Sequence, residues 1–279
     1  QHIMNQDQSR IVAELNENGF AQSHVKDLFD PQTLEYFNKG IEYYNGFMSN
    51  PHIQERANRI AQGNPIQDRG KWFEITAYEY LNRGLSLRDG GFVNMYLSPN
   101  ITDIAEAYHG VTPRLRNVLT WIHPQNPTQS ERASQVWHRD QEDYKILKVF
   151  IAYSDIGPDN GPTQFVKKTQ YEGKYGDITN NMNGKSTSTF KYDIPQEEIV
   201  SCEGPAGSIF FVNANGLHKG GLIKKGVRCL THGNYLNPLA PHIVNDVLGT
   251  FDYSDKVNIL DRNSDEYLAL TDKQRNILK

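Results

Sequence analysis

Apolar residues in the N-terminal part of the chain recur at spacings of three and four, which is the period of an amphipathic helix. The clearest such stripe consists of Leu34, Phe37, Ile41 and Tyr44. Its helix is predicted to begin at Asp30-Pro31, because aspartate caps helix N-termini and proline is favoured in the first turn. The pattern therefore predicts a helical part over about residues 5–115, with a strand expected at 92–97.

From about residue 116 the pattern changes to short β-rich runs separated by Gly, Pro, Asn and Asp. The runs cover residues 118–122, 146–153, 208–212 and 227–235. Many short strands with turn signals between them are typical of a β-sandwich or barrel. We therefore expect a mainly β protein with flanking helices. It forms a single domain over residues 1–279, with a β core at about 116–240 and a C-terminal extension at 241–279.

Composition narrows the class of protein. Of the 279 residues, 37% are hydrophobic, which is enough for a sizeable core. The net charge of −4 gives no basic footprint for nucleic acid, and no apolar run is long enough to cross a membrane. Two cysteines are too few for a disulfide scaffold. We expect Cys202 and Cys229 to be half-buried thiols in strands, and the protein to be cytoplasmic.

Three residues have the types and spacing of a metal site. His138 and Asp140 are two positions apart, and residues i and i+2 of a strand face the same side. His218 follows the apolar run at 208–212, and a strand there would bring it beside the pair. Two imidazoles and one carboxylate on one face of an octahedron leave three positions open, which ferrous oxygenases need for a cosubstrate and oxygen.

An arginine stands ten residues after the second histidine. Arg228 opens a strand-like run, and its guanidinium is suited to gripping a carboxylate through two parallel hydrogen bonds. A dicarboxylic keto acid would then present its other end to the metal. The pair His138 and Asp140 alone is more often a surface histidine beside a solvated aspartate. Its conjunction with His218 and Arg228 favours a functional site.

At these residues the sequence resembles the phytanoyl-CoA dioxygenase-like family, which includes ectoine hydroxylase. The resemblance is clearest from Val136 to Tyr235, and is carried by residues 137–140, 147–153, 159–163 and 204–211, by His218 and by the strand from Arg228. It implies a double-stranded β-helix, the jelly-roll core of cupin-like proteins. It also implies that His138, Asp140 and His218 bind iron(II), and that Arg228 binds the far carboxylate of 2-oxoglutarate.

The resemblance further implies a dioxygenase that uses O2 and releases succinate and CO2. We expect a hydroxylase of a small-molecule metabolite, a natural-product tailoring enzyme being one form. Related halogenases replace the carboxylate ligand by a small residue, so Asp140 favours hydroxylation. Where the family commonly has Pro-Gly-Ser-His, this chain has Lys167 to Gln170, and neither phytanoyl-CoA nor ectoine is inferred as its substrate.

Two residues are candidates for contact with the cosubstrate. Asn117 stands where family members often have an amide that contacts 2-oxoglutarate, and its alternative role is that of a strand-edge turn residue. Thr163 follows Gly161-Pro162, and its alternative is a hydroxyl that satisfies the turn backbone.

Three residues are candidates for the substrate pocket. His232 lies four residues after Arg228, so strand alternation puts both on one face. Trp72 and Tyr96 come from the variable region where such enzymes build substrate lids. Ordinary core packing is the alternative for all three. The loop at 171–191 is long and polar, and we predict that it is a mobile lid.

Three other functions fit the same residues. The first is hydroxylation of a protein or peptide side chain. The second is a non-catalytic jelly-roll binding module with a vestigial metal site. The third is a metal-dependent cupin that does not use 2-oxoglutarate.

Overall fold

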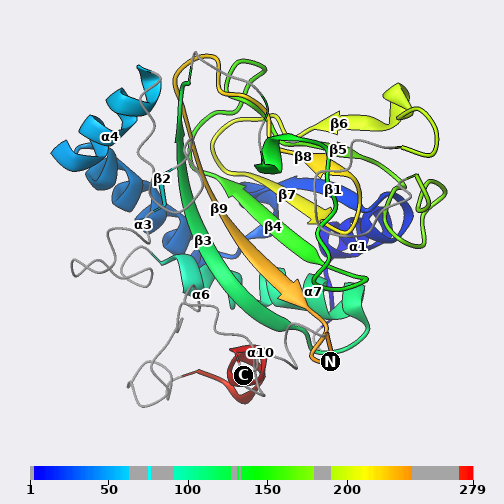
Figure 1. Ribbon diagram of the computed structural model, residues 1–279. Helices are drawn as coiled ribbons and strands as arrows, with labels where there is room; N and C mark the ends of the chain where they lie inside the picture. Colours follow the sequence, from blue (N-terminus) through cyan, green and yellow to red (C-terminus); the bar gives the residue numbers. More distant parts are fainter. Residues whose placement is uncertain are drawn as a thin grey trace.

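Antiparallel sheets form the centre of the molecule, and the N-terminal helices cover one face of the larger sheet (Figure 1). The computed structural model describes residues 3–62, 75–76, 91–126, 131, 133–178, 190–240 and 270–278. The larger sheet has the order β1 (Phe20–His24), β7 (Ser208–Asn213), β4 (Leu147–Ala152), β9 (Val227–Leu236), β3 (Arg114–Pro124), β2 (Ile75–Thr76). The smaller sheet has the order β6 (Ile199–Ser201), β5 (Gln164–Val166), β8 (His218–Lys219).

The helices occupy both ends of the chain. They are α1 (Gln6–Asn18), α2 (Val25–Leu28), α3 (Pro31–Met48), α4 (Pro51–Ala61), α6 (Phe92–Tyr96), α7 (Pro99–His109) and α10 (Asp272–Leu278), with short 3₁₀ turns η1 (Ala133–Gln135) and η2 (Gln196–Glu198). The predicted start of α3 is confirmed, because the Asp30 side chain accepts a hydrogen bond from the Thr33 amide at 2.7 Å. Among the described residues, no helix combines the length and apolar composition needed to cross a membrane.

The predicted strand at residues 92–97 is wrong, because this run forms helix α6. Phe92, Val93, Met95 and Tyr96 are all fully buried, so the run has no exposed side and no period that separates helix from strand. Tyr96 packs under β9, where its hydroxyl lies 3.0 Å from the Val149 carbonyl and 2.8 Å from the Thr231 hydroxyl.

The helical part and the β part are joined through the larger sheet. β1 lies in the N-terminal part, yet it pairs with β7 as an edge strand of the core. Helix α10 packs back from the C-terminal extension, where Gln274 donates a hydrogen bond to the Leu97 carbonyl at 3.2 Å and Lys273 pairs with Asp103 at 2.6 Å. Both contacts join α10 to the N-terminal helical part, and the single domain stays a prediction.

The two faces of β9 serve different purposes. Cys229 and Tyr235 point into the hydrophobic core beneath the helices. The alternate residues Arg228, His232 and Asn234 therefore face the interior between the two sheets. Their cross-strand partners on β3 and β4 line the same interior, which contains Asn117, Trp121, His123, Lys148 and Phe150.

The two cysteines are more deeply buried than expected. Cys229 lies in β9 as predicted, whereas Cys202 directly follows β6, and both are buried. Burial raises the pKa of each thiol to about 12, so neither is reactive near neutral pH.

Candidate metal centre

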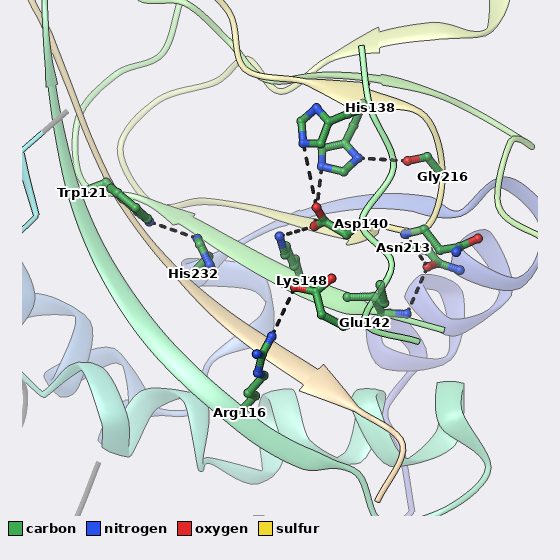
Figure 2. Close-up of polar contacts among 12 residues, drawn as sticks. Arg116, Trp121, His138, Asp140, Glu142, Lys148, Asn213, Gly216 and His232 are labelled. Atoms are coloured by element: carbon green, nitrogen blue, oxygen red, sulfur yellow. Dashed lines mark hydrogen bonds and ion pairs between the residues drawn. The ribbon is translucent and has the colours of Figure 1, made fainter. Parts of the chain in front are cut away.

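His138, Asp140 and His218 meet at one point although 78 positions separate the second and third residues in the chain. Each offers a ligand atom, and these atoms lie within 4.8 Å of one another. Nε2 of His138 is 3.9 Å from one carboxylate oxygen of Asp140, and Nε2 of His218 is 3.8 Å from the other. Figure 2 shows the His138 ring directed at the Asp140 carboxylate. Among the described residues, this is the one cluster of histidine, cysteine and carboxylate groups able to hold a metal.

Both imidazoles are fixed with the correct nitrogen toward the centre. Nδ1 of His138 lies 2.7 Å from the Val136 carbonyl, and Nδ1 of His218 lies 2.9 Å from the Gly216 carbonyl. A carbonyl only accepts, so Nδ1 carries the proton in each ring and Nε2 keeps its lone pair for a metal. Burial, followed by the charge of His138, lowers the pKa of His218 to about 3, which keeps the ring neutral.

The backbone itself brings the three side chains together. His138 and His218 form an isolated antiparallel bridge in which each amide donates to the other residue's carbonyl at 2.9 Å. The Asp140 amide donates to the Ala214 carbonyl at 2.9 Å. The segment around His138 and Asp140 thus runs beside β8 as a short extension of the smaller sheet. The donor set of two imidazoles and one carboxylate on this frame fits iron(II).

Lys148 joins the centre, although the sequence patterns did not single it out. It lies in β4 on the interior face, and its ammonium contacts the Asp140 carboxylate (Figure 2). Burial opposes ionisation of Asp140, but the charge of Lys148 and the two histidines hold its pKa well below the ordinary value. A single lysine within the apolar run of β4 was the available signal, since a buried charge in a strand needs a partner.

Arg139 secures the loop between the two upstream ligands. Its buried guanidinium donates to the carbonyls of Thr169 at 2.5 Å, Asn215 at 2.7 Å and Gly176 at 3.0 Å. Residues 171–178 of the predicted lid therefore pack against the centre as turns, and 179–189 lie outside the described residues. The lid stays a prediction.

Arg228 is buried at the start of β9, as expected from its position. Its guanidinium donates to the carbonyl of Gly161, in the turn that precedes β5. Gly161 adopts φ +64°, and a Cβ there would come within 2.6 Å of the Gly221 carbonyl. This turn therefore requires glycine, and it holds a carbonyl against the arginine.

His232 shares the interior face with Arg228. The indole N–H of Trp121 donates to its Nδ1 at 3.2 Å, so Nε2 carries the proton and is a hydrogen-bond donor. The Phe150 ring lies 5.2 Å away. These neighbours leave the role of His232 in substrate contact as a prediction.

The remaining candidate residues lie at different distances from the interior of the sheets. Asn117 lies on the interior face of β3, and Thr163 precedes β5, where its carbonyl accepts from the Cys202 amide at 2.8 Å. Tyr96 is fully buried in the helical core and hydrogen-bonded there, so ordinary packing replaces the substrate role proposed for it. Trp72 lies outside the described residues.

Comparisons with known proteins agree with this geometry. A sequence model of the phytanoyl-CoA dioxygenase family matches residues 15–224. The epimerase SnoN, in complex with Fe3+, α-ketoglutarate and nogalamycin RO, superimposes with a TM-score of 0.53 at 16% identity, covering 84% of this chain and 85% of its own. AviO1 from Streptomyces viridochromogenes Tue57 gives a TM-score of 0.51 at 15% identity, covering 86% of this chain and 99% of its own. No curated protein matches the sequence significantly.

The family match spans more than half of the chain and includes all three residues of the cluster. The structural likenesses, at such low identity, show the fold alone. The chain therefore belongs to the phytanoyl-CoA dioxygenase family, whose members are non-haem enzymes that depend on iron and 2-oxoglutarate.

Proposed function

We propose that this protein hydroxylates a small-molecule metabolite, with iron(II) held by His138, Asp140 and His218. The observation that carries the proposal is the convergence of these side chains, with both Nδ1 atoms tied to carbonyls. Iron and 2-oxoglutarate, when bound, supply the oxidation of a substrate C–H bond. The overall reaction consumes O2 and 2-oxoglutarate, and yields a hydroxylated substrate, succinate and CO2.

The strand order supports a double-stranded β-helix as the frame of this site. β3, β9, β4 and β7 are adjacent in the larger sheet, and β6, β5 and β8 form the smaller one. The bridge from His138 to β8 adds a fourth segment to the smaller sheet. Two four-membered antiparallel layers facing each other are the arrangement of a jelly roll.

Arg228 is the proposed anchor of 2-oxoglutarate. It is a buried guanidinium on the interior face of β9, where a carboxylate would gain two charge-assisted hydrogen bonds. Thr163, next to the turn that Arg228 contacts, remains a candidate for the same cosubstrate. Phe150 and Leu230 face the same interior, and their apolar surface helps to exclude water from the site.

The retained carboxylate of Asp140 supports hydroxylation rather than halogenation. A small-molecule substrate also suits the neighbours, since the SnoN structure contains nogalamycin RO. These observations favour a metabolite, and a natural-product tailoring role is the form we propose first.

The test is formation of the enzyme complex followed by turnover. Anaerobic addition of iron(II) and 2-oxoglutarate is expected to produce a weak visible charge-transfer band, and admission of air to produce succinate slowly even without substrate. Both signals should disappear in His138→Ala. A wild-type protein that binds iron(II) yet gives neither band nor succinate would sink the proposal in favour of a cupin or a binding module.

The assignment of Arg228 has its own measurement. Arg228→Ala is expected to raise the dissociation constant of 2-oxoglutarate by about 100-fold, because two charge-assisted hydrogen bonds are lost. Binding of Mn(II), used as a stable substitute for iron(II), should change little. Arg228→Lys keeps the charge but not the forked guanidinium. Its dissociation constant for 2-oxoglutarate should lie between those of the parent and Arg228→Ala. Equal loss of metal and 2-oxoglutarate binding would show that Arg228 acts only on the fold.

A further inference from the structure

Two asparagines face each other across neighbouring strands beside the metal centre. Asn117 on β3 is the cross-strand partner of Asn234 on β9, on the interior face. Asn234 is 2% exposed. The side-chain oxygens of both are buried, and neither has a hydrogen-bond partner within the part of the chain that the structure describes. An unsatisfied buried amide costs about 1–3 kcal/mol, so two adjacent ones call for an explanation.

A neighbouring asparagine shows how such an amide is normally satisfied. Asn213, at the end of β7, is 1% exposed. Its amide nitrogen donates to the Tyr108 hydroxyl at 2.8 Å, and its oxygen accepts from the amides of Ile146 and Asn215 at 3.2 Å. Asn213 and Asn234 are thus about equally buried, but the side-chain amide of Asn213 is fully hydrogen-bonded whereas the side-chain oxygen of Asn234 has no partner among the described residues.

The amide pair lies well along β9 from Arg228. Asn234 and Arg228 are six residues apart on one face of β9, which corresponds to about 20 Å between their Cα atoms at 3.3–3.4 Å per residue. The carboxyl carbons of 2-oxoglutarate are separated by four C–C bonds, or at most about 6 Å. Because a 2-oxoglutarate anchored at Arg228 uses its length to reach the metal, we assign Asn117 and Asn234 to a different molecule, and contact of Asn117 with 2-oxoglutarate is the alternative.

The same register puts the pair next to the metal ligands. Lys148 is the cross-strand neighbour of Asn234 on β4, and its ammonium contacts Asp140. Arg116, next to Asn117, pairs with Glu142 at 3.2 Å (Figure 2). A molecule that reaches the pair thus lies close to the reacting centre.

The surrounding charges select the kind of group that fits. Lys148 and Arg116 disfavour a cation, whereas Asp140 and Glu142 disfavour an anion, and the four formal charges sum to zero. An amide offers both a donor and an acceptor. A neutral group that also donates and accepts, such as a hydroxyl or an amide, satisfies the site without an uncompensated charge.

We propose that Asn117 and Asn234 form a substrate subsite for a neutral hydroxyl or amide group, and that the substrate is a hydroxylated or amide-bearing molecule rather than an acyl chain. This inference rests on the proposed function, since the subsite is defined by its distance from the 2-oxoglutarate anchor and its nearness to the metal ligands. The two side-chain oxygens have no partner among the described residues and are paired when substrate binds.

The first test needs no ligand. Asn234→Leu keeps the number and branching of the side-chain heavy atoms and removes the unpaired amide, so the thermal midpoint of the metal-free protein should stay unchanged or rise by roughly 2–4 °C. The matched control Asn213→Leu breaks three hydrogen bonds and should lower the midpoint by roughly 4 °C or more. Asn117→Leu provides a second reading. A midpoint lowered as much in Asn234→Leu and Asn117→Leu as in the control would overturn the proposal, because the amides would then be structural.

The second test distinguishes the subsite from the function. The anaerobic iron(II)–2-oxoglutarate protein is titrated with myo-inositol, N-acetylglucosamine, hexanoate and hexylamine, and the charge-transfer band is followed. A neutral probe should perturb the band, with about tenfold weaker binding in Asn234→Leu. Tighter binding of hexanoate or hexylamine, or no response to either neutral probe although the band forms, would refute the subsite. If no band forms at all, the proposed function fails, and the stability comparison still decides whether the amides are structural.

Discussion

Asp140 is the residue on which the centre depends most, because three cationic or metal-binding groups converge on its carboxylate. His138 and His218 approach it from one direction, and Lys148 contacts it from another. Burial would lower the pKa of Lys148, yet Asp140 and Glu142 keep it above its ordinary value. The pair is thus charged inside the protein, and each partner depends on the other.

Removing one member of that pair should destabilise the metal-free protein. Lys148→Met leaves the buried Asp140 carboxylate without its cation, at an expected cost of about 3–5 kcal/mol in the free energy of unfolding. Urea denaturation measures this cost. Mn(II) should restore part of it, because the metal then compensates the carboxylate.

A matched surface change calibrates that result. Lys39→Met breaks an exposed pair with Glu35 in α3, where the side chains are 50% and 66% exposed, and should cost less than about 1 kcal/mol. If the two variants lose the same stability, Lys148 does not form the ion pair described above.

At the scale of elements, β9 couples the helical core to the site. Its residues alternate, so that one face of the strand packs on the helical core and the other faces the metal site. Its outer residue Gly233 lies against the Tyr96 ring, and a Cβ there would come within 2.5 Å of a ring carbon. Neither the ring nor the strand has room to move, since Tyr96 is fully buried and β9 pairs on both edges. The glycine is required by close packing and not by a left-handed backbone.

Two glycine substitutions should therefore have opposite signs. Gly233→Ala overpacks the contact between α6 and β9 and is expected to cost about 1–3 kcal/mol. Gly46→Ala, in α3, meets no atom within 4 Å and should stabilise by about 0.5–1 kcal/mol, because alanine favours helix. Thermal or urea unfolding of both variants gives the comparison. A neutral Gly233→Ala would mean that the two elements separate easily.

The end of α7 provides a dependence of stability on pH. Burial, followed by the charge of Lys145, lowers the pKa of His109 to about 4, against 6.5 for an unperturbed histidine. Between these values the unfolded chain binds more protons than the folded one. This contribution to stability is complete above about pH 6.5 and is lost as the pH falls toward 4.

His109→Gln should remove that dependence in part. The variant is expected to lose less stability than the parent between pH 7 and 4.5, with a difference of at most about 3 kcal/mol. Urea midpoints of the metal-free proteins at the two pH values measure it. Parallel losses in parent and variant would locate the titrating group elsewhere.

The elements that sequence patterns predict well are the long ones with a clear period. Helix α3 and the strands β3, β4, β7 and β9 overlap the predicted segments. β5, β6 and β8 have two or three residues each, which is too short for alternation to be visible. β1 was also missed, because its place in the sheet depends on pairing with β7, far away in the chain.

The site divides in a similar way. His138 and Asp140 were inferred from strand alternation, although the structure gives their segment only an isolated bridge at His138, and His218 and Arg228 were inferred from their spacing and from the family resemblance. Lys148, Asn234 and the Trp121 contact to His232 depend on cross-strand register. Register is fixed by packing over the whole sheet, and no local pattern of residues contains it.

At the scale of the whole molecule, backbone hydrogen bonds build the site into the fold. The ligands are held by backbone bridges between segments of the smaller sheet, and Arg139 ties the same loop to three carbonyls. Zinc-finger domains show the opposite behaviour, since their chains unfold when the metal is removed.

Chelation should therefore be reversible. Treatment with a chelator is expected to leave the far-ultraviolet circular dichroism unchanged and to lower the thermal midpoint by a few degrees. Saturating Mn(II) with 2-oxoglutarate should restore it, because ligands that bind only the folded state stabilise by mass action, by about 2.7 kcal/mol at 100 times the dissociation constant. Loss of secondary structure on chelation would contradict a preformed centre.

The mutual backbone hydrogen bonds of His138 and His218 have a consequence for the supply of metal. A metal site whose ligands are already in place discriminates poorly among divalent ions that accept two imidazoles and a carboxylate. The order of intrinsic affinities then places cobalt, nickel and copper above iron(II). We therefore expect the ion that occupies the protein in a cell to depend on which metals that cell leaves exchangeable, and excess cobalt or nickel to compete with iron(II) for the site.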